Sequence, residues 1–432
     1  DLVDQAASAH GRRQAFTCVA ANGMNGTLTF DKVGQMSDAF AAFLHHECGL
    51  KPGDRVAVQL PNGLAYPVVA FGVFKAGCVL GNTNPLYTPS EMIHQFNDSG
   101  AKVLVIVDMF ADKLAEVVPN TSIETVVLAG VPEFFPKIPE FIIRGVQKVW
   151  SRTLPAVPSL SVPVLRLKSA LARGRSHGVG SRAMWQDLGY DDLAILQYTG
   201  GTTGIAKGAM LSHGNLLNNL AQMQAVSGGL LTIDDCVLTA LPLYHIFAFT
   251  ANLMVFFEIG ARNILVPSPR PVQNLQRAIE NFPITWITGV NTLFNGLMNE
   301  EWFSVYPPRK LRAAIAGGTA LHAAVATRWR IMTGTPLAEG YGLTETSPIV
   351  SFNPIGDRAK PGSIGMPVPG TDVILVDEDG KPVAFGQPGE LLVRGPQVMQ
   401  GYWQRPEETA STLRNGWLGT GAAAALAEGG GP

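Results

Sequence analysis

The residues best suited to chemistry form a loop rich in glycine and threonine between positions 199 and 207. A short apolar run precedes the loop and a helical pattern follows it, which predicts a strand–loop–helix arrangement. The glycines let a ligand approach the backbone, the threonines offer hydroxyl donors, and a lysine adds a positive charge. The sequence therefore predicts a polyphosphate-binding loop made of Thr199, Gly200, Gly201, Thr202, Thr203, Gly204 and Lys207.

The spacing within this loop differs from that of the P-loop kinases and ATPases. Two residues separate Gly204 from Lys207, and a glycine follows the lysine where those proteins have serine or threonine. A P-loop kinase or ATPase is therefore disfavoured. A flexible loop without a ligand is the other interpretation, because clusters of glycine and threonine are common in loops.

The complete string YTGGTTGIAKGAMLSHGNL, residues 198–216, resembles the signature loop of the adenylate-forming superfamily of acyl-CoA synthetases, luciferases and peptide-synthetase adenylation domains. Within that superfamily, YHIFAFT, TGVNTLFN and GPQVMQGYWQRP are most similar to bacterial long-chain fatty-acid-CoA ligases. Further matching strings follow in the expected order and cover nearly the whole chain: GDRVAVQLPNG, LPLYHIFAFT, ITGVNTLFNGL, AGG, EGYGLTET, GSIGMPVPG and GELLVRGPQVMQGYWQRPEET.

The resemblance implies that a fatty acid, ATP and coenzyme A are substrates and that Mg²⁺ takes part. The acid's carboxylate would attack the α-phosphate of ATP, pyrophosphate would leave, and the thiol of coenzyme A would then attack the acyl-adenylate. Reactions of this type depend mainly on donors and cations held where negative charge lies. Two alternatives stay open: an aryl- or medium-chain-CoA ligase, and a catalytically silent protein that binds nucleotide or acyl groups.

By the same resemblance, the catalytic candidates are Lys207, His245, Thr344 and Glu345. Glu345 would hold Mg²⁺, a hard cation that takes oxygen ligands and bridges to phosphate, and Thr344 would contact the α-phosphate. Outside such a motif, a glutamate or tyrosine is more often a solvated charge or a packed ring. The nucleotide-binding set further includes Gly317, Gly318, Glu339, Gly340, Tyr341 and Gly342, with the Tyr341 ring against adenine.

The resemblance also implies an acyl-binding region. His245 would lie near the carboxylate, and Phe249 at the gate of an acyl tunnel, although a structural histidine and a core aromatic are the plainer interpretations. Gly289, Val290, Asn291 and Phe294 would line the acyl pocket. A buried alkyl chain gains about 0.8 kcal/mol per CH₂, but apolar pockets distinguish one methylene by only about 1–3 kcal/mol, so the preferred chain length is not predicted.

The elements that position these residues follow a strand–helix alternation from residue 55 onward. Within it, Thr88, Pro89 and Glu91 predict the start of a helix with a capping box. Beyond residue 350, short strands and turns replace the alternation. We predict an α/β fold of two packed doubly wound α/β subdomains and a smaller β-rich, barrel-like subdomain, with residues 1–190, 191–349 and 350–432 as the three parts.

An irregular basic segment, residues 131–190, interrupts the alternation. Within residues 139–152 the spacing predicts a basic amphipathic helix, which would either dock on an anionic membrane surface or pack against its own domain. One face carries Ile142, Ile143, Val146, Val149 and Trp150, and another carries Arg144, Lys148 and Arg152.

Composition narrows the class further. The chain has 432 residues, a net charge of -2, and four scattered cysteines without a CxxC pair, which argues against nucleic-acid binding, a zinc knuckle and a disulfide framework. No run resembles a membrane span or a signal peptide. A cytoplasmic protein is predicted, with peripheral contact at the inner face of the membrane and a homodimer as open alternatives.

The pattern departs from the superfamily near residue 420. Thr420 and Gly421 match, but Ala422 stands where the superfamily has the aspartate that binds the ribose hydroxyls. Loss of such hydrogen bonds weakens ATP binding by about 0.5–3 kcal/mol. The mobile C-terminal domain with its catalytic lysine is expected to be absent, so residues 1–432 are expected to bind both substrates, adenylate poorly and make little acyl-CoA.

Overall fold

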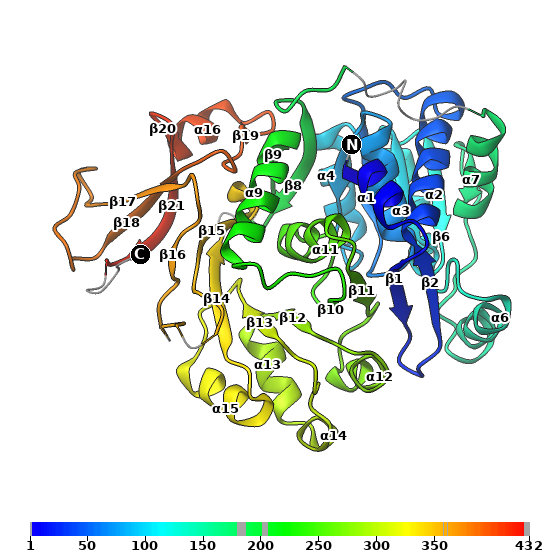
Figure 1. The fold of residues 1–432 in the computed structure, drawn as a ribbon. Coiled ribbons are helices and arrows are strands. Elements are labelled where there is room, and N and C mark those ends of the chain that lie inside the picture. The colour runs from blue at the N-terminus through cyan, green and yellow to red at the C-terminus, as the bar shows by residue number, and fades with distance from the viewer. Residues whose placement is uncertain (1, 179–186, 201–205, 357, 361, 427–432) are drawn as a thin grey trace.

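The computed structural model describes residues 2–178, 187–200, 206–356, 358–360 and 362–426 (Figure 1). Two large mixed sheets make up most of the protein, and a small antiparallel sheet projects from one side. The predicted α/β class, with two packed α/β parts and a smaller β-rich part, is confirmed. Within the described residues all four cysteines are free, and no helix is both long and apolar enough to cross a membrane.

The first large sheet has eight strands among the described residues. Its central strands are parallel, whereas the last two at one end are antiparallel to their neighbours. In spatial order the strands are β19 (Gly401–Tyr402), β9 (Lys207–Ser212), β8 (Leu193–Thr199), β4 (Val79–Asn82), β3 (Arg55–Gln59), β5 (Val103–Val107), β6 (Thr125–Ala129) and β7 (Val164–Arg166).

The second large sheet has nine strands within the described residues and is likewise parallel in the middle. In spatial order they are β16 (Met366–Pro367), β15 (Ile349–Phe352), β14 (Leu337–Gly342), β13 (Ala313–Ala316), β12 (Trp286–Gly289), β10 (Cys236–Thr239), β11 (Arg262–Leu265), β1 (Gln14–Val19) and β2 (Asn25–Thr29). The small sheet contains β17 (Asp372–Val376), β18 (Gly389–Arg394), β21 (Trp417–Ala424) and β20 (Leu413–Arg414).

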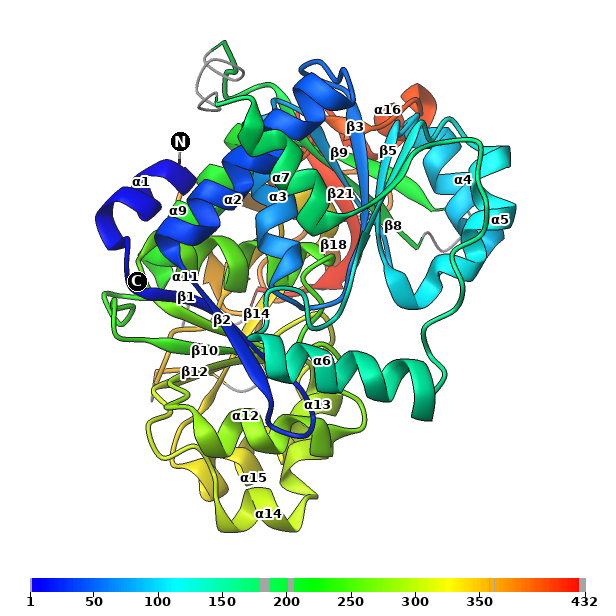
Figure 2. The same cartoon turned by 90° about the vertical axis from the view of Figure 1, so that its right-hand side faces the viewer.

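Helices cover both faces of each large sheet (Figure 2). They are α1 (Leu2–His10), α2 (Phe30–Ala42), α3 (Ala65–Lys75), α4 (Pro89–Ser99), α5 (Leu114–Val117), α6 (Lys137–Gly145), α7 (Leu167–Ser176), α9 (His213–Val226), α10 (Ile246–Ala248), α11 (Val255–Glu258), α12 (Gln276–Asn281), α13 (Asn291–Met298), α14 (Glu301–Val305), α15 (Ala323–Thr333) and α16 (Pro406–Thr412). A π-helical turn, η4 (Val146–Trp150), extends α6, and another, η5 (Phe249–Met254), joins α10 to α11.

Alternation along the strands explains the layers. In β5, Val103 and Val105 belong to the core shared by the two large sheets, whereas Leu104 and Ile106 pack under α4 and α5. Both faces of the strand are buried, as expected of a parallel sheet between helices. Helix α3 lies in the shared core, and its Tyr66 hydroxyl donates to Leu243 O at 2.9 Å, which ties the first sheet to the loop after β10.

Neither large sheet is built from one continuous part of the chain. β8 and β9 extend the first sheet, and β1 pairs with β11 in the second, with Phe16 opposite Asn263. Sequence reasoning did not foresee this arrangement. The division into residues 1–190, 191–349 and 350–432 stays a prediction. Each of the two large sheets contains strands from more than one of these parts.

The predicted start of a helix at Thr88 is confirmed. The Thr88 hydroxyl accepts from Glu91 N at 3.4 Å, Glu91 Oε2 accepts from Thr88 N at 2.7 Å, and Pro89 occupies the first turn. At the other end Gly100 has a φ of 62°, the left-handed conformation that favours glycine.

Candidate active site

A cavity of about 550 Å³ lies at the carboxyl ends of β13 and β14 and beside the β8–β9 hairpin. Ligands of open α/β sheets characteristically bind at the carboxyl ends of the strands. Segments distant in sequence meet there, among them the hairpin, the start of α10 and strands β19 and β21. The lining includes eleven of the predicted residues: Thr199, Gly200, Lys207, His245, Gly317, Gly318, Gly340, Tyr341, Gly342, Thr344 and Glu345.

The base of the predicted phosphate loop is well defined. Thr199 and Lys207 face each other as a pair where β8 and β9 run antiparallel. The Lys207 ammonium lies 5.6 Å from the centre of the Tyr402 ring, inside the range of a cation–π contact. Gly201, Thr202, Thr203 and Gly204 fall outside the described residues.

Glu345 is the one acidic side chain that lines the cavity within the described part of the chain. It sits in a 3₁₀ turn, Thr344–Thr346, whose start is capped by the Thr346 hydroxyl accepting from Leu343 N at 3.0 Å. Its backbone oxygen accepts from Met399 N at 2.8 Å. Glu345 Oε1 accepts from the Tyr402 hydroxyl at 2.7 Å, so the carboxylate is held toward β19.

A cation at Glu345 would need most of its ligands from elsewhere. Among the described residues, no group of three or more His, Cys, Asp or Glu side chains could hold a metal ion. A single carboxylate beside the Thr344 hydroxyl suits Mg²⁺, which keeps several waters and takes phosphate oxygens as ligands. The donor set therefore fits a metal ion that is bound together with a polyphosphate.

Tyr402 also lines the cavity but was not among the predicted site residues, although it stands in the quoted string GPQVMQGYWQRP. Burial raises the pKa of its hydroxyl, and the nearby Glu345 carboxylate raises it further. The hydroxyl therefore stays protonated at neutral pH and remains a hydrogen-bond donor. The sequence offered one indication of this residue, its place in a string that matches the superfamily. The resemblance implied no role for Tyr402 itself.

For the ATP-dependent adenylation that the resemblance implies, replacing Tyr402 with phenylalanine should lower the turnover about tenfold, because a hydrogen bond to a charged group is lost. The Michaelis constant for the carboxylic acid should stay the same, since the change frees the Glu345 side chain without touching the acid. Steady-state pyrophosphate exchange measures both quantities. The matched control is Tyr306→Phe, at a half-exposed tyrosine that follows α14. Equal turnover in Tyr402→Phe and the parent would contradict the positioning role.

Side chains are disfavoured at two glycines of the cavity wall, by crowding at Gly317 and by the backbone conformation at Gly318. A Cβ on Gly317 would come within 3.2 Å of Gly340 O, and Gly318 has a φ of +77°. A flat ligand can therefore lie against bare backbone. Tyr341 stands between Gly340 and Gly342, and its hydroxyl is buried without a hydrogen bond of good geometry within the described residues. Burial raises the pKa of this hydroxyl, and the nearby Thr420 side chain offsets part of that rise.

Glu339 does not line the cavity. Its side chain is buried, accepts from Leu321 N at 3.0 Å, and so fixes the loop that follows Gly318. Burial raises the pKa of this carboxyl group, and the Leu321 hydrogen bond offsets part of that rise. In the described structure Glu339 supports the wall of the site.

His245 lines the cavity, and its side chain is exposed to the solvent there. Partial desolvation by the surrounding protein lowers the pKa of the imidazole. Its Nδ1 accepts from Phe247 N at 3.4 Å at the start of α10. The neutral ring therefore carries its proton on Nε2, where it is a donor.

The residues proposed for the acyl pocket lie near the cavity but, in the described part of the chain, none of them lines it. Phe249 is fully buried, with its ring centre 6.0 Å from that of Phe74. Phe294 is also fully buried and packs edge-on against Trp329.

Gly289, Val290 and Asn291 adjoin the glycine wall. Gly289 O accepts from Gly317 N at 3.1 Å, and Asn291 Oδ1 accepts from His322 N at 3.1 Å. Val290 is the nearest neighbour of a Cβ built on Gly318. Their part in acyl binding stays a prediction.

Comparison with known proteins places the chain in a family. The AMP-binding enzyme family model matches residues 3–403. The chain is 45% identical over 430 residues to a long-chain-fatty-acid–CoA ligase of Escherichia coli O157:H7, covering 99% of this chain and 74% of that protein.

Two solved structures have the same fold. The anthranilate CoA ligase AuaEII in complex with anthranoyl-AMP superposes with a TM-score of 0.84 at 22% identity, covering 99% of this chain and 76% of that one. ATP-bound MatB from Rhodopseudomonas palustris superposes with a TM-score of 0.78 at 27% identity, covering 99% and 77%. With the family model matching most of its length, the chain belongs to the AMP-binding enzyme family.

Proposed function

We propose that this protein activates long-chain fatty acids with ATP to form acyl-adenylates, as the first half of acyl-CoA synthesis. The observation that carries the proposal is the meeting of Lys207, Glu345 and His245 around one cavity with a glycine wall. A cation, a metal-binding carboxylate and a neutral imidazole donor are the groups that this chemistry needs. The name of the Escherichia coli relative supports the long-chain acid.

ATP would lie with its base against the glycine wall and its phosphates toward the β8–β9 hairpin. Gly317 and Gly318 offer bare backbone, and Tyr341 lines the same cavity, where its ring would contact the base. Lys207 and Thr199 at the base of the hairpin would meet the phosphates. The ATP held by the structurally similar MatB supports this assignment.

In the reaction, a carboxylate oxygen attacks the α-phosphorus and forms a new P–O bond. The bond from that phosphorus to the bridging oxygen breaks, and pyrophosphate leaves with the electron pair. Nε2–H of His245 would orient the carboxylate, while Lys207 and the Thr344 hydroxyl would stabilise negative charge on the phosphates. Mg²⁺, when held by Glu345, would supply further positive charge there.

The thiol step and the setting of the enzyme are also proposals. Coenzyme A would attack the acyl-adenylate in a second half-reaction, whereas the residues described here are assigned to the first. Since long-chain acids partition into lipid, we propose that the protein works in the cytoplasm at the inner face of the membrane. A homodimer is compatible with this proposal and is not required by it.

The test is carboxylate-dependent exchange of labelled pyrophosphate into ATP, measured over a series of acyl chain lengths and aryl acids. Exchange that peaks with long-chain acids is expected. Exchange that peaks with aryl acids would transfer the assignment to an aryl-CoA ligase. No exchange with any acid, in this chain or in one extended to the length of its relatives, would overturn the proposal and favour a silent binding protein.

Replacing Ala422 with aspartate should tighten ATP binding about tenfold, because the carboxylate would gain hydrogen bonds to the ribose hydroxyls. Ala422 follows the cavity-lining Thr420 in β21 and is half-buried, and its N–H donates to the Thr420 hydroxyl at 3.1 Å. Calorimetric titration with ATP measures the affinity. Ala423→Asp, at the next and exposed position, is the matched control. Equal affinities of the two variants would count against a ribose contact at 422.

A further inference from the structure

The rod formed by α6 and η4 carries an unusual outer surface. It lies at the edge of the molecule opposite the small sheet (Figures 1 and 2). In α6, whose residues are all described, no side chain is buried. Five large apolar side chains of α6 and η4 are exposed to solvent, with exposed fractions of 73% for Ile138, 79% for Phe141, 40% for Ile142, 51% for Val146 and 75% for Val149. Ile143 is different, because it is half-buried and packs against the core.

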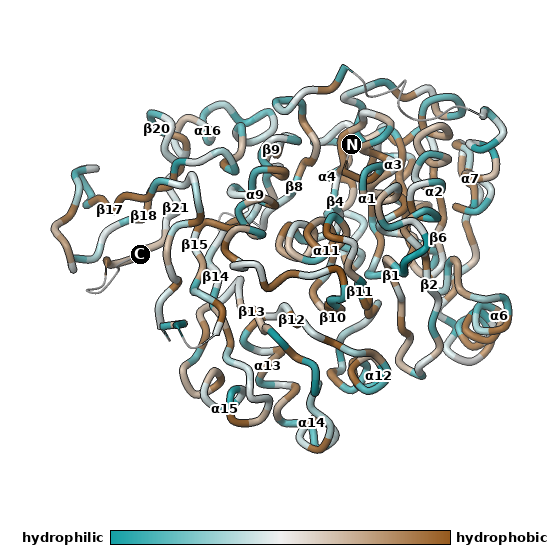
Figure 3. The backbone as a smooth tube through the Cα atoms, viewed as in Figure 1, coloured by the Kyte–Doolittle hydropathy of each residue, from teal (hydrophilic) through white to brown (hydrophobic). Residues whose placement is uncertain are grey.

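These five residues form one continuous stripe, which we name the outer face. Their spacings of three and four residues place them on a single side of the helix. The hydropathy colouring shows the apolar character of this peripheral helix (Figure 3). Contiguous exposed apolar surface of this kind marks an interaction site in a folded protein.

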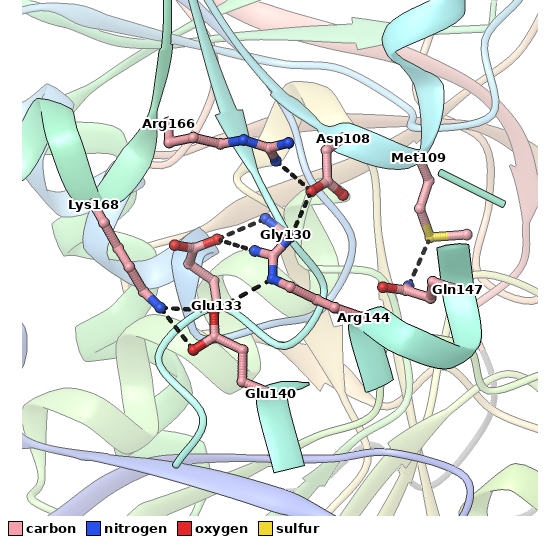
Figure 4. Close-up of polar contacts among 9 residues, drawn as sticks. All are labelled: Asp108, Met109, Gly130, Glu133, Glu140, Arg144, Gln147, Arg166 and Lys168. Carbon is pink, nitrogen blue, oxygen red and sulfur yellow. Dashed lines mark hydrogen bonds and ion pairs between the residues drawn. The ribbon is translucent and has the colours of Figure 1, made fainter. Parts of the chain in front are cut away.

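The opposite side of the rod contacts the protein body mainly through polar side chains (Figure 4), and Ile143 is the apolar residue that packs against the core. Arg144 lies at its centre and forms ion pairs with Asp108 at 3.1 Å and with Glu133 at 3.3 Å. A third ion pair, with Glu140 at 3.3 Å, lies within the helix. One turn later, Gln147 Nε2 lies 3.5 Å from the Met109 sulfur. A side chain on Gly130 would collide with the Arg144 guanidinium, so the glycine makes room for it.

The rod is therefore reversed relative to an ordinary surface helix, which packs its apolar side inward. Asp108 and Glu133 are both almost fully buried, and rotating the helix to bury the outer face would remove Arg144 from them. A buried carboxylate without its partner is strongly unfavourable. The ion pairs thus hold the apolar stripe outward, and the exposure is built into the fold.

We propose that the outer face inserts into the boundary between headgroups and acyl chains of an anionic lipid bilayer. Charge favours lipid over a protein partner: from Lys137 to Arg175 the chain has eight lysines and arginines and one acidic residue, although its net charge is -2. Lys137, Lys148 and Arg152 are exposed around the stripe, where they can contact lipid phosphates. The use of such a surface rests on the proposed function, since the bilayer dissolves a long-chain acid.

The experiment measures sedimentation of the full chain with lipid vesicles. Vesicles of phosphatidylcholine mixed with phosphatidylglycerol should bind the parent protein, and pure phosphatidylcholine should bind it less. The double variant Phe141→Ser/Val149→Ser should lower the partition coefficient at least about tenfold, because two inserting side chains are lost. The double variant Lys137→Glu/Lys148→Glu should remove the preference for phosphatidylglycerol.

The matched control is Ile331→Ser/Val305→Ser, which removes two exposed apolar side chains from α15 and α14. It should bind vesicles like the parent. Equal loss in both serine variants, or no loss in Phe141→Ser/Val149→Ser, would overturn the proposal. It would also be overturned if the parent were a dimer that this variant makes monomeric, because the outer face would then belong to a second copy.

A second measurement separates this inference from the proposed function. Pyrophosphate exchange with a short acid that stays in solution should be the same in the parent and in Phe141→Ser/Val149→Ser. Exchange with a long-chain acid supplied in vesicles should fall several-fold in the variant alone. If the parent shows no exchange with any acid, the proposed function fails, whereas vesicle sedimentation still decides the docking surface.

Discussion

Replacing Glu345 with glutamine should lower carboxylate-dependent pyrophosphate exchange by about 100- to 1000-fold, the loss typical of a group that stabilises charge in the transition state. Glutamine keeps the size of the side chain and an oxygen that can accept from Tyr402, so the 3₁₀ turn should persist. It lacks the negative charge that we propose holds Mg²⁺. Initial exchange rates, measured over a range of Mg²⁺ concentrations, give the result.

Glu301→Gln is the matched control for this variant. Glu301 is exposed in the first turn of α14, so its substitution should leave exchange unchanged. Exchange by Glu345→Gln within a few-fold of the parent at all Mg²⁺ concentrations would refute the assigned metal-binding role. Recovery of the exchange rate at high Mg²⁺ concentration would support that role, because a site with weakened affinity is still occupied when the metal is abundant.

Replacing Arg144 with methionine should lower the free energy of unfolding by about 3 kcal/mol, the low end of the cost of breaking a buried ion pair. The low end applies because Asp108 keeps its 2.6 Å ion pair with Arg166, whereas Glu133 loses its cation. Denaturation by urea measures the change. Arg175→Met, at an exposed arginine in the last turn of α7, should cost little and serves as the control.

The loss should depend on pH in a definite direction. Burial raises the pKa of Glu133 even though Arg144 is present, and removal of the guanidinium should raise it further. A carboxyl group whose pKa is higher in the folded than in the unfolded state stabilises the fold at low pH and ceases to do so as pH rises. The deficit of Arg144→Met should therefore be largest at mildly alkaline pH and shrink in acid. A deficit that grows in acid would contradict this explanation.

Sequence patterns predicted a helix or strand well where the residues that determine it are close together in the chain. The Thr88 capping box lies within one helical turn, so four consecutive residues specify it. The strand–helix alternation likewise gave the class of fold. The pairing of β1 with β11 was beyond such reasoning, because it joins Phe16 to Asn263 and is decided by packing in the shared core.

The orientation of α6 shows a second limit. Helical periodicity separated its apolar residues from its basic ones, but it cannot tell which side contacts the protein. That choice depends on Asp108 and Glu133, which lie in other segments and whose burial appears only in the folded chain. Arg144, predicted to share a basic face with Lys148, contacts Asp108 and Glu133 of the protein body, whereas Lys148 is exposed.

For the candidate site, the motifs identified residues that do meet at one cavity, among them Lys207, His245 and Glu345. They did not separate residues that face the cavity from those that support it. Glu339 and Phe294 turn away from it, because neighbouring loops and the Trp329 ring occupy their surroundings. Tyr402 was overlooked since its partner, Glu345, is distant in sequence.

The bond between Tyr402 and Glu345 bears on the order in which ligands arrive. A bare cation that enters the cavity must replace a hydrogen bond already made, and it finds no second carboxylate among the described lining residues. A cation that enters on a triphosphate brings further oxygen ligands with it. If Glu345 binds the metal ion as proposed, the phenol should weaken the binding of free metal, and metal and nucleotide are then expected to enter as one complex.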